Sequence, residues 1–227
     1  MKSDRAFFDA IARRYDRVYA ESGAESKEGL AKVVTSLTKS SAKRVLVLGV
    51  GTGRELSALL DAGLSPVGLD FSKEMLTLCD RRTRKVPLVE ADFWQPLPFD
   101  PRSFDAAIAL HGTIAHPPQD DDSLTSLAQE LARVLRRPGT VIVEVPTQAM
   151  ANKIPELLEL PDGRRMKRSG HVLTHEDTVA NVAIEARLLP LEVYENALKT
   201  AGFAIDTVTN ESGVASLTGA LPQNSPV

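Results

Sequence analysis

Residues 45–53 read VLVLGVGTG, an apolar run that passes directly into three alternating glycines. The apolar part predicts a buried strand over Arg44–Gly49, and a helix is expected to follow over Arg54–Ala62. Glycines let the backbone approach a ligand closely, and free N–H groups at a helix start favour an anion or polar oxygens. The dinucleotide fingerprint G-x-G-x-x-G would need its third glycine at position 54, which is Arg54 here. The loop is therefore a candidate ligand site with a spacing of its own.

Outward from this loop, short apolar segments alternate with amphipathic ones. Strands are expected over Pro66–Asp70, Pro87–Glu90, Phe104–Leu110 and Thr140–Val145, and helices over Lys73–Arg84 and Ser123–Arg137. Such alternation predicts a parallel sheet covered by helices on both faces. A helix over Leu191–Thr200 then precedes a hairpin of Phe203–Val208 and Gly213–Leu217. The expected fold class is α/β: a Rossmann-like, doubly wound seven-stranded sheet, mostly parallel, with a C-terminal antiparallel hairpin.

The N-terminal residues predict a helical cover for this sheet. In Arg5–Ala20 the apolar residues recur at helical spacing, while Asp9 and Asp16 fall on the opposite, polar side. A second helix is expected over Glu28–Lys39.

Composition and charge exclude several classes of protein. Hydrophobic residues make up 43% of the 227 residues and charged residues 25%, which is ordinary for a globular protein and excludes a fibrous or disordered one. The net charge of −3 gives no field that would attract nucleic acid. The single cysteine, Cys79, cannot form an intramolecular disulfide, and the charged N-terminus resembles no secretory signal. We therefore expect a cytoplasmic protein that binds neither DNA nor membranes, and no spacing suggests a metal site.

Two carboxylates follow successive strands of the expected sheet. Asp70 ends the second strand, and a carboxylate there can accept both hydroxyls of a ribose. Asp92 follows the third strand, where it could accept from an adenine amino group or cap a turn. Because ligands bind at the carboxyl edge of such sheets, the two carboxylates and the glycine loop together indicate a nucleoside-containing ligand.

The motifs as a set resemble a known family. They are the glycine loop, Val67–Leu76, Ala91-Asp92, Pro98-Phe99 with Ser103–Asp105, and Glu130–Gly139. Together they are similar to class I S-adenosylmethionine-dependent methyltransferases, and closest to the small-molecule branch called methyltransferase type 11. The N-terminal segments Phe7–Asp9 and Arg14–Asp16 resemble the covering helix of that branch.

The resemblance implies roles for individual residues. Gly49, Gly51 and Gly53 would pack against the methionine part of S-adenosylmethionine, and Asp70 would hold its ribose. The adenine would be flanked by Phe71 and Met75 and bound at its edge by Asp92 and the backbone of Phe93. Leu110 and His111 would lie along the methionine moiety, and Tyr15 would close over it. For Phe71, Met75 and Tyr15, core packing is the alternative.

The resemblance also divides the chain. We expect a single methyltransferase domain over 1–227, in which 1–40 is the N-terminal cover and 43–146 the cofactor-binding core. An acceptor-pocket insertion (147–190), with strand character near Ala183–Leu188, is followed by a C-terminal helix and hairpin (191–219) and a tail (220–227).

Methyl transfer from a sulfonium needs alignment above all, and a general base only where the acceptor must lose a proton. His111 and His116 follow the fourth strand in the loop that faces the acceptor, so each is a candidate base. Each could instead serve a structural role. His171 and His175, in the insertion, are candidates to line the acceptor pocket.

The acceptor itself is not encoded in these motifs. We expect a small molecule, and the basic cluster Arg164–Arg168 favours an anionic one. A monomer or a homodimer would fit. The alternatives are an NAD(P)-dependent oxidoreductase, a non-catalytic S-adenosylmethionine-binding module and a methyltransferase acting on tRNA.

Overall fold

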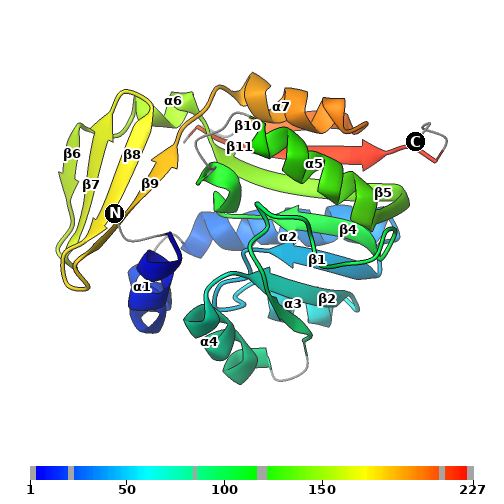
Figure 1. Ribbon diagram of the computed structural model, residues 1–227, viewed down its shortest axis with the longest axis horizontal. Helices are drawn as coiled ribbons and strands as arrows, with labels where there is room; N and C mark the ends of the chain where they lie inside the picture. The colour runs from blue at the N-terminus through cyan, green and yellow to red at the C-terminus, as the bar shows by residue number, and fades with distance from the viewer. Residues whose placement is uncertain (1–3, 20–22, 84–85, 117–121, 210–212, 224–227) are drawn as a thin grey trace.

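A computed structural model describes residues 4–19, 23–83, 86–116, 122–209 and 213–223. Its centre is a seven-stranded sheet in the order β10-β11-β5-β4-β1-β2-β3 (Figure 1). The strands are β1 (Arg44–Leu48), β2 (Ser65–Asp70), β3 (Leu88–Glu90), β4 (Phe104–Ala109), β5 (Leu135–Pro146), β10 (Ala204–Thr209) and β11 (Val214–Leu221). The five strands β1 to β5 run parallel, while β11 pairs antiparallel with both β5 and β10. The predicted fold class is confirmed.

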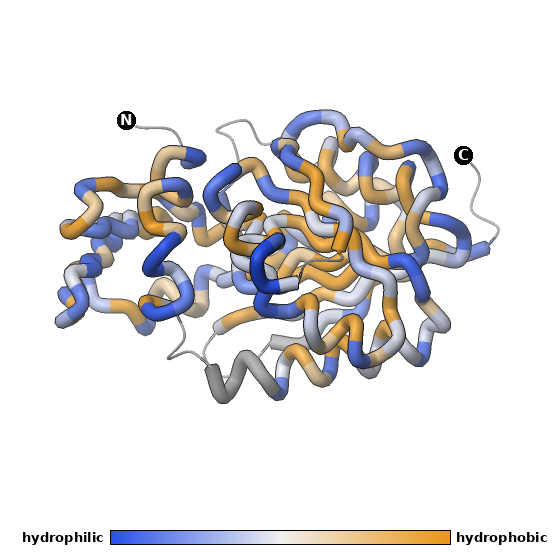
Figure 2. The backbone as a smooth tube through the Cα atoms, turned by 90° about the horizontal axis from the view of Figure 1, so that it is seen from below, coloured by the Kyte–Doolittle hydropathy of each residue, from blue (hydrophilic) through white to orange (hydrophobic). Residues whose placement is uncertain are grey.

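Helices cover both faces of this sheet. Successive side chains of β1 point to opposite faces, and both sets are apolar, so both faces must be buried. Leu46 and Leu48 point to the face covered by α5 (Ser123–Val134) and α7 (Leu191–Thr200). Val45 and Val47 point to the face covered by α2 (Gly23–Lys39), α3 (Leu56–Asp61) and α4 (Lys73–Thr83). Seen from below in Figure 2, the most apolar segments gather in these central strands. No helix in the described ranges has the length and apolar character needed to cross a membrane.

Helix α5 ends three residues earlier than expected. It stops at Val134, and β5 begins at Leu135 instead of Thr140. Leu135 is 1% exposed and pairs with Phe104 at the start of β4, ahead of a register shift. Burial of Leu135 against β4 therefore ends the helix before Pro138 and Gly139 are reached.

The insertion forms a second sheet of four antiparallel strands. They are β6 (Leu157–Glu159), β7 (Arg164–Ser169), β8 (Val172–Asp177) and β9 (Val182–Arg187), in that order across the sheet, and a short helix, α6 (Gln148–Ala151), precedes them. Strand character was expected only near β9, so three of these strands were not predicted. Helix α1 (Asp4–Tyr19) packs against both α4 and β9 and so lies between the two parts of the molecule (Figure 1).

Candidate active site

The three glycines of the loop after β1 all have positive φ, but they are not equivalent. A Cβ on Gly49 (φ +59°) would lie 2.4 Å from Thr113 Cγ2, and one on Gly53 (φ +76°) would lie 2.6 Å from Cys79 Sγ. A Cβ on Gly51 (φ +53°) would meet only the carbonyl oxygen of Gly49, at 3.9 Å. Packing therefore requires glycine at 49 and 53, whereas the protein leaves the space beside Gly51 open.

Asp70 joins the end of β2 to this loop. Its Oδ2 accepts from the N–H of Gly51 at 2.8 Å, and its Oδ1 accepts from the N–H of Ser72 at 2.8 Å. The residue is 5% exposed. Burial raises the pKa of the Asp70 carboxyl, the N–H groups around it oppose the shift, and the charge of Asp9 adds to it. A buried carboxylate beside an open glycine suits a ligand that offers hydroxyl donors.

Asp92 lies at the same edge of the sheet, after β3, and caps a turn there. Its Oδ1 accepts from the N–H of Trp94 at 3.0 Å. The side chain of Phe93 is 9% exposed and packs into the core, so only its backbone can serve a ligand. Leu110, after β4, is likewise buried.

Helix α1 contacts the loops around Asp70 with two carboxylates. Asp9 accepts from Ser72 Oγ at 2.6 Å, and Asp16 accepts from Thr52 Oγ1 and pairs with Arg82. The sequence placed these two aspartates on a polar helix face and missed their partners. Their spacing of seven residues, which brings them to one side of a helix, was the available signal.

The aromatic and sulfur side chains proposed to enclose the ligand lie at the junction with α1. Met75 is 1% exposed within a cluster that includes Phe7 and Ile11, as the core-packing alternative requires. The ring of Phe71 lies 5.8 Å from that of Phe8. Tyr15 packs at the border of the same cluster, and the guanidinium of Arg54 lies 5.8 Å from its ring centroid.

The two candidate bases face different neighbours. His111, at φ +56°, has its Nε2 3.0 Å from Glu55 Oε1, on the side of the glycine loop. His116 has its Nδ1 2.8 Å from the carbonyl oxygen of Glu185 in β9. A carbonyl can only accept, so Nδ1 carries the proton and Nε2 keeps its lone pair. Burial lowers the pKa of His116, which keeps the ring neutral and able to accept a proton.

The histidines of the insertion also differ. His175 lies on β8, opposite Ile184 of β9, and its pKa is lowered to about 4, chiefly by burial and further by the neighbouring Arg164 guanidinium. His171 is exposed in the turn between β7 and β8.

The basic cluster of β7 is occupied by interactions within the protein. Arg164 pairs with Asp162, Arg165 and Lys167 both pair with Glu176, and the Nε of Arg168 donates to the carbonyl oxygen of Ile154. These side chains connect β7 to β8 and to the neighbouring turns of the second sheet. Among the described residues, no group of three or more His, Cys, Asp or Glu is arranged to hold a metal ion.

Residues 45–139 match the family described as Methyltransferase domain. An uncharacterized protein of Methanocaldococcus jannaschii is 28% identical over 207 residues, which are 88% of this chain and 76% of that protein. The demethylmenaquinone methyltransferase of Clavibacter sepedonicus is 32% identical over 145 residues, 61% of this chain and 56% of that enzyme. The chain thus spans little more than half the length of this relative. The solved structure of the sugar N-methyltransferase KedS8 of a Streptoalloteichus species has a TM-score of 0.71 at 24% identity and covers 92% of both chains.

The family match over residues 45–139, together with the sheet order and the glycine loop, supports a class I S-adenosylmethionine-dependent methyltransferase. Residues 45–139 are its methyltransferase domain, and the resemblance read from the motifs is confirmed.

Proposed function

We propose that this protein transfers a methyl group from S-adenosylmethionine to a small-molecule acceptor by in-line displacement, mainly through alignment of the two. The observation that carries the proposal is the buried Asp70 carboxylate, bound to the N–H of Gly51 where the glycine loop has no side chain. Alignment alone can supply about 7–11 kcal/mol of the barrier in reactions of this type. When bound, S-adenosylmethionine supplies the methyl group on a sulfonium, which needs no further activation.

The residues of the carboxyl edge divide the work of holding the cofactor. Asp70 would accept from ribose hydroxyls with the lone pairs that its two N–H donors leave free. Asp92 and the backbone of Phe93 would serve the adenine edge. The glycine loop would take the methionine part, with Leu110 and His111 beside it. At the junction with α1, the adenine would be flanked by Phe71 and Met75, and Tyr15 would cover the bound cofactor.

The acceptor would lie where α1, the loop that carries His116 and the second sheet meet. This region corresponds to residues of about 1–30, 111–119 and 147–190, of which residues 1–3, 20–22 and 117–119 fall outside the described ranges. His116 is the better-placed base because its neutral ring is held by Glu185 of that sheet, while His111 is engaged with Glu55. An anionic acceptor stays a prediction, although the side chains of the basic cluster already have partners within the protein.

Two kinds of acceptor are worth testing first. One similar protein is named for demethylmenaquinone, and a similar structure belongs to a sugar N-methyltransferase. A hydroquinone ring and an amino sugar both lose a proton when methylated, so either would use a base. These chemistries are the reason for including both in the experiment.

We further propose a cytoplasmic protein, a monomer or homodimer, built as the single domain divided above into cover, core, insertion and C-terminal part. The buried thiol of Cys79, whose pKa is raised to about 11 by burial, fits a reduced structural role.

Formation of S-adenosylhomocysteine tests the proposal. The protein is incubated with S-adenosylmethionine and a panel of hydroquinones, amino sugars and small amines. We expect turnover with at least one acceptor class, and His116→Ala should lower it about a hundredfold, the smaller end of general-base effects. Affinity for S-adenosylhomocysteine should stay within threefold.

Lys39→Ala serves as the control, because Lys39 is exposed at the end of α2 and lies outside the region proposed for the acceptor. Loss of cofactor affinity in His116→Ala would give the residue a structural role. Cofactor binding without turnover of any acceptor would favour the non-catalytic binding module.

A further inference from the structure

Helix α1 is bound on two sides by two different parts of the protein. One apolar cluster contains Phe7 and Ile11 of α1, Met75 of α4, and Val182 and Ile184 of β9. The helix is therefore the physical link between the cofactor-binding core and the second sheet.

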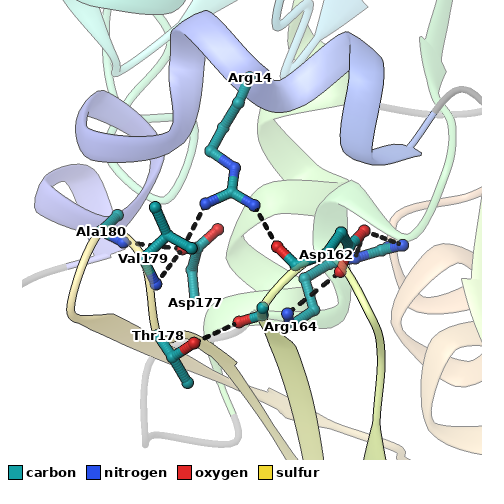
Figure 3. Close-up of polar contacts among 8 residues, drawn as sticks. Arg14, Asp162, Arg164, Asp177, Thr178, Val179 and Ala180 are labelled. Carbon is teal, nitrogen blue, oxygen red and sulfur yellow. Dashed lines mark hydrogen bonds and ion pairs between the residues drawn. The ribbon is translucent and has the colours of Figure 1, made fainter.

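The polar contacts of α1 follow the same division. Asp9 and Asp16 face the core, where they bind Ser72 and Thr52 next to the Asp70 site. At about 100° per residue, Arg14 points about 140° away from Asp9 and about 160° away from Asp16, so it leaves the helix on the other side. Figure 3 shows its guanidinium directed at the second sheet.

Arg14 forms hydrogen bonds to two hairpin turns of that sheet. Its Nη1 lies 2.9 Å from Asp177 Oδ1, where β8 ends, and its Nη2 donates to the carbonyl oxygen of Asp162, in the turn before β7, at 2.6 Å (Figure 3). Asp177 Oδ1 also accepts from the N–H groups of Val179 and Ala180 at 3.0 and 2.8 Å. One guanidinium thus connects α1 to both the β6–β7 and the β8–β9 turns.

This ion pair is largely buried, with side-chain exposures of 14% for Arg14 and 4% for Asp177. A buried pair is weak evidence for stability, because desolvation offsets the attraction, but loss of one partner leaves a buried charge unpaired. Such a pair favours one relative arrangement of the elements that it joins.

We propose that Arg14 is a positioning residue that couples cofactor binding to the second sheet. A ligand bound at Asp70 and Gly51 reduces the motion of the loops that accept contacts from Asp9 and Asp16 of α1. Helix α1 then becomes less mobile as well. Through Arg14, it restricts the motion of the turns at Asp162 and Asp177. The cofactor would thereby order the sheet that bounds the acceptor. This inference rests on the proposed function, since it needs the cofactor at Asp70.

Amide hydrogen exchange with S-adenosylhomocysteine as the probe tests the coupling. In the wild-type protein, saturation with this ligand should slow exchange in the glycine loop, in α1 and across residues 157–187. In Arg14→Met the ligand should still bind within about threefold of the wild-type affinity and protect the glycine loop. Protection of residues 157–187 should fall to less than half.

Two further variants keep the result interpretable. Arg13→Met changes an exposed arginine on the same helix and should behave as wild type. Asp177→Asn keeps an oxygen for the N–H groups of Val179 and Ala180 but removes the charge that faces Arg14. It should also lower the ligand-dependent protection of residues 157–187 to less than half, and it provides the test if Arg14→Met does not fold.

Three outcomes would overturn the coupling. Undiminished ligand-dependent protection of residues 157–187 in Arg14→Met or Asp177→Asn would do so, as would its absence in a wild-type protein that binds the ligand. Failure of the wild-type protein to bind S-adenosylhomocysteine would overturn the proposed function, and the coupling with it.

Discussion

Asp70→Ala is expected to weaken the binding of S-adenosylhomocysteine at least tenfold, about 1.4 kcal/mol. The carboxylate is buried, its Oδ2 lies 2.8 Å from the N–H of Gly51 at the open side of the glycine loop, and two N–H groups hold it in position. Alanine removes the acceptor for ribose hydroxyls and also releases the N–H of Gly51, so the loop loses one connection to β2 and keeps the backbone hydrogen bond from Val50 to Leu69. Isothermal titration calorimetry measures the change.

Asp61→Ala is the matched control for this prediction. Asp61 is exposed at the end of α3, so its loss changes the net charge equally but leaves the site intact. The control should bind as wild type does. An unchanged affinity in Asp70→Ala would remove the ribose assignment.

Alanine substitutions at two glycines of the loop should have different effects on the free energy of unfolding and on the affinity for S-adenosylhomocysteine. Gly49→Ala is expected to lower the free energy of unfolding by about 2–4 kcal/mol, because it adds a positive-φ cost of about 1–2 kcal/mol to overpacking against Thr113. Gly51→Ala should lose only the positive-φ part but weaken S-adenosylhomocysteine binding at least tenfold. Its methyl group would fill the space through which the backbone approaches the ligand.

Gly63→Ala provides the reference for the conformational cost alone. Gly63 has φ +74° and nothing within 4 Å of an added Cβ. Urea unfolding and calorimetry on the three variants give both quantities. Wild-type affinity in Gly51→Ala would mean that the ligand does not approach the loop, and equal unfolding free energies for Gly49→Ala and Gly63→Ala would contradict the packing argument.

The larger sheet could be predicted because its signals are local. Val45 and Val47 alternate with Leu46 and Leu48 to serve two buried faces, and the glycines that follow need backbone conformations that other residues rarely adopt. Asp70 and Asp92 could be placed at one edge because parallel strands share their direction.

The first three strands of the second sheet could not be predicted, because they lack the clear apolar alternation that β9 has. In β7, Arg165 and Lys167 pair with Glu176 on β8, while Arg164 and Arg168 are bound by Asp162 and by a backbone carbonyl. Charged residues therefore occur at successive positions of the strand, a pattern typical of a solvated loop.

The contacts of α1 could not be predicted either, because they join residues that are far apart in the sequence. Asp16 meets Thr52 from 36 residues away, and Arg14 meets Asp177 from 163 residues away. From the sequence alone, each of these side chains is predicted to be exposed on a helix, because its partner is brought near only by the tertiary structure. The end of α5 escaped prediction for a similar reason, since it depends on the burial of Leu135 against β4.

The central claim is that the glycine loop and Asp70 bind S-adenosylmethionine and not a dinucleotide. Calorimetric titration of the wild-type protein with S-adenosylhomocysteine and, separately, with NADH and NADPH tests it most directly. We expect one S-adenosylhomocysteine per chain, with a dissociation constant below about 100 μM, near −5.5 kcal/mol, and no heat from either dinucleotide. Saturable binding of NADH or NADPH, with none of S-adenosylhomocysteine, would contradict the account.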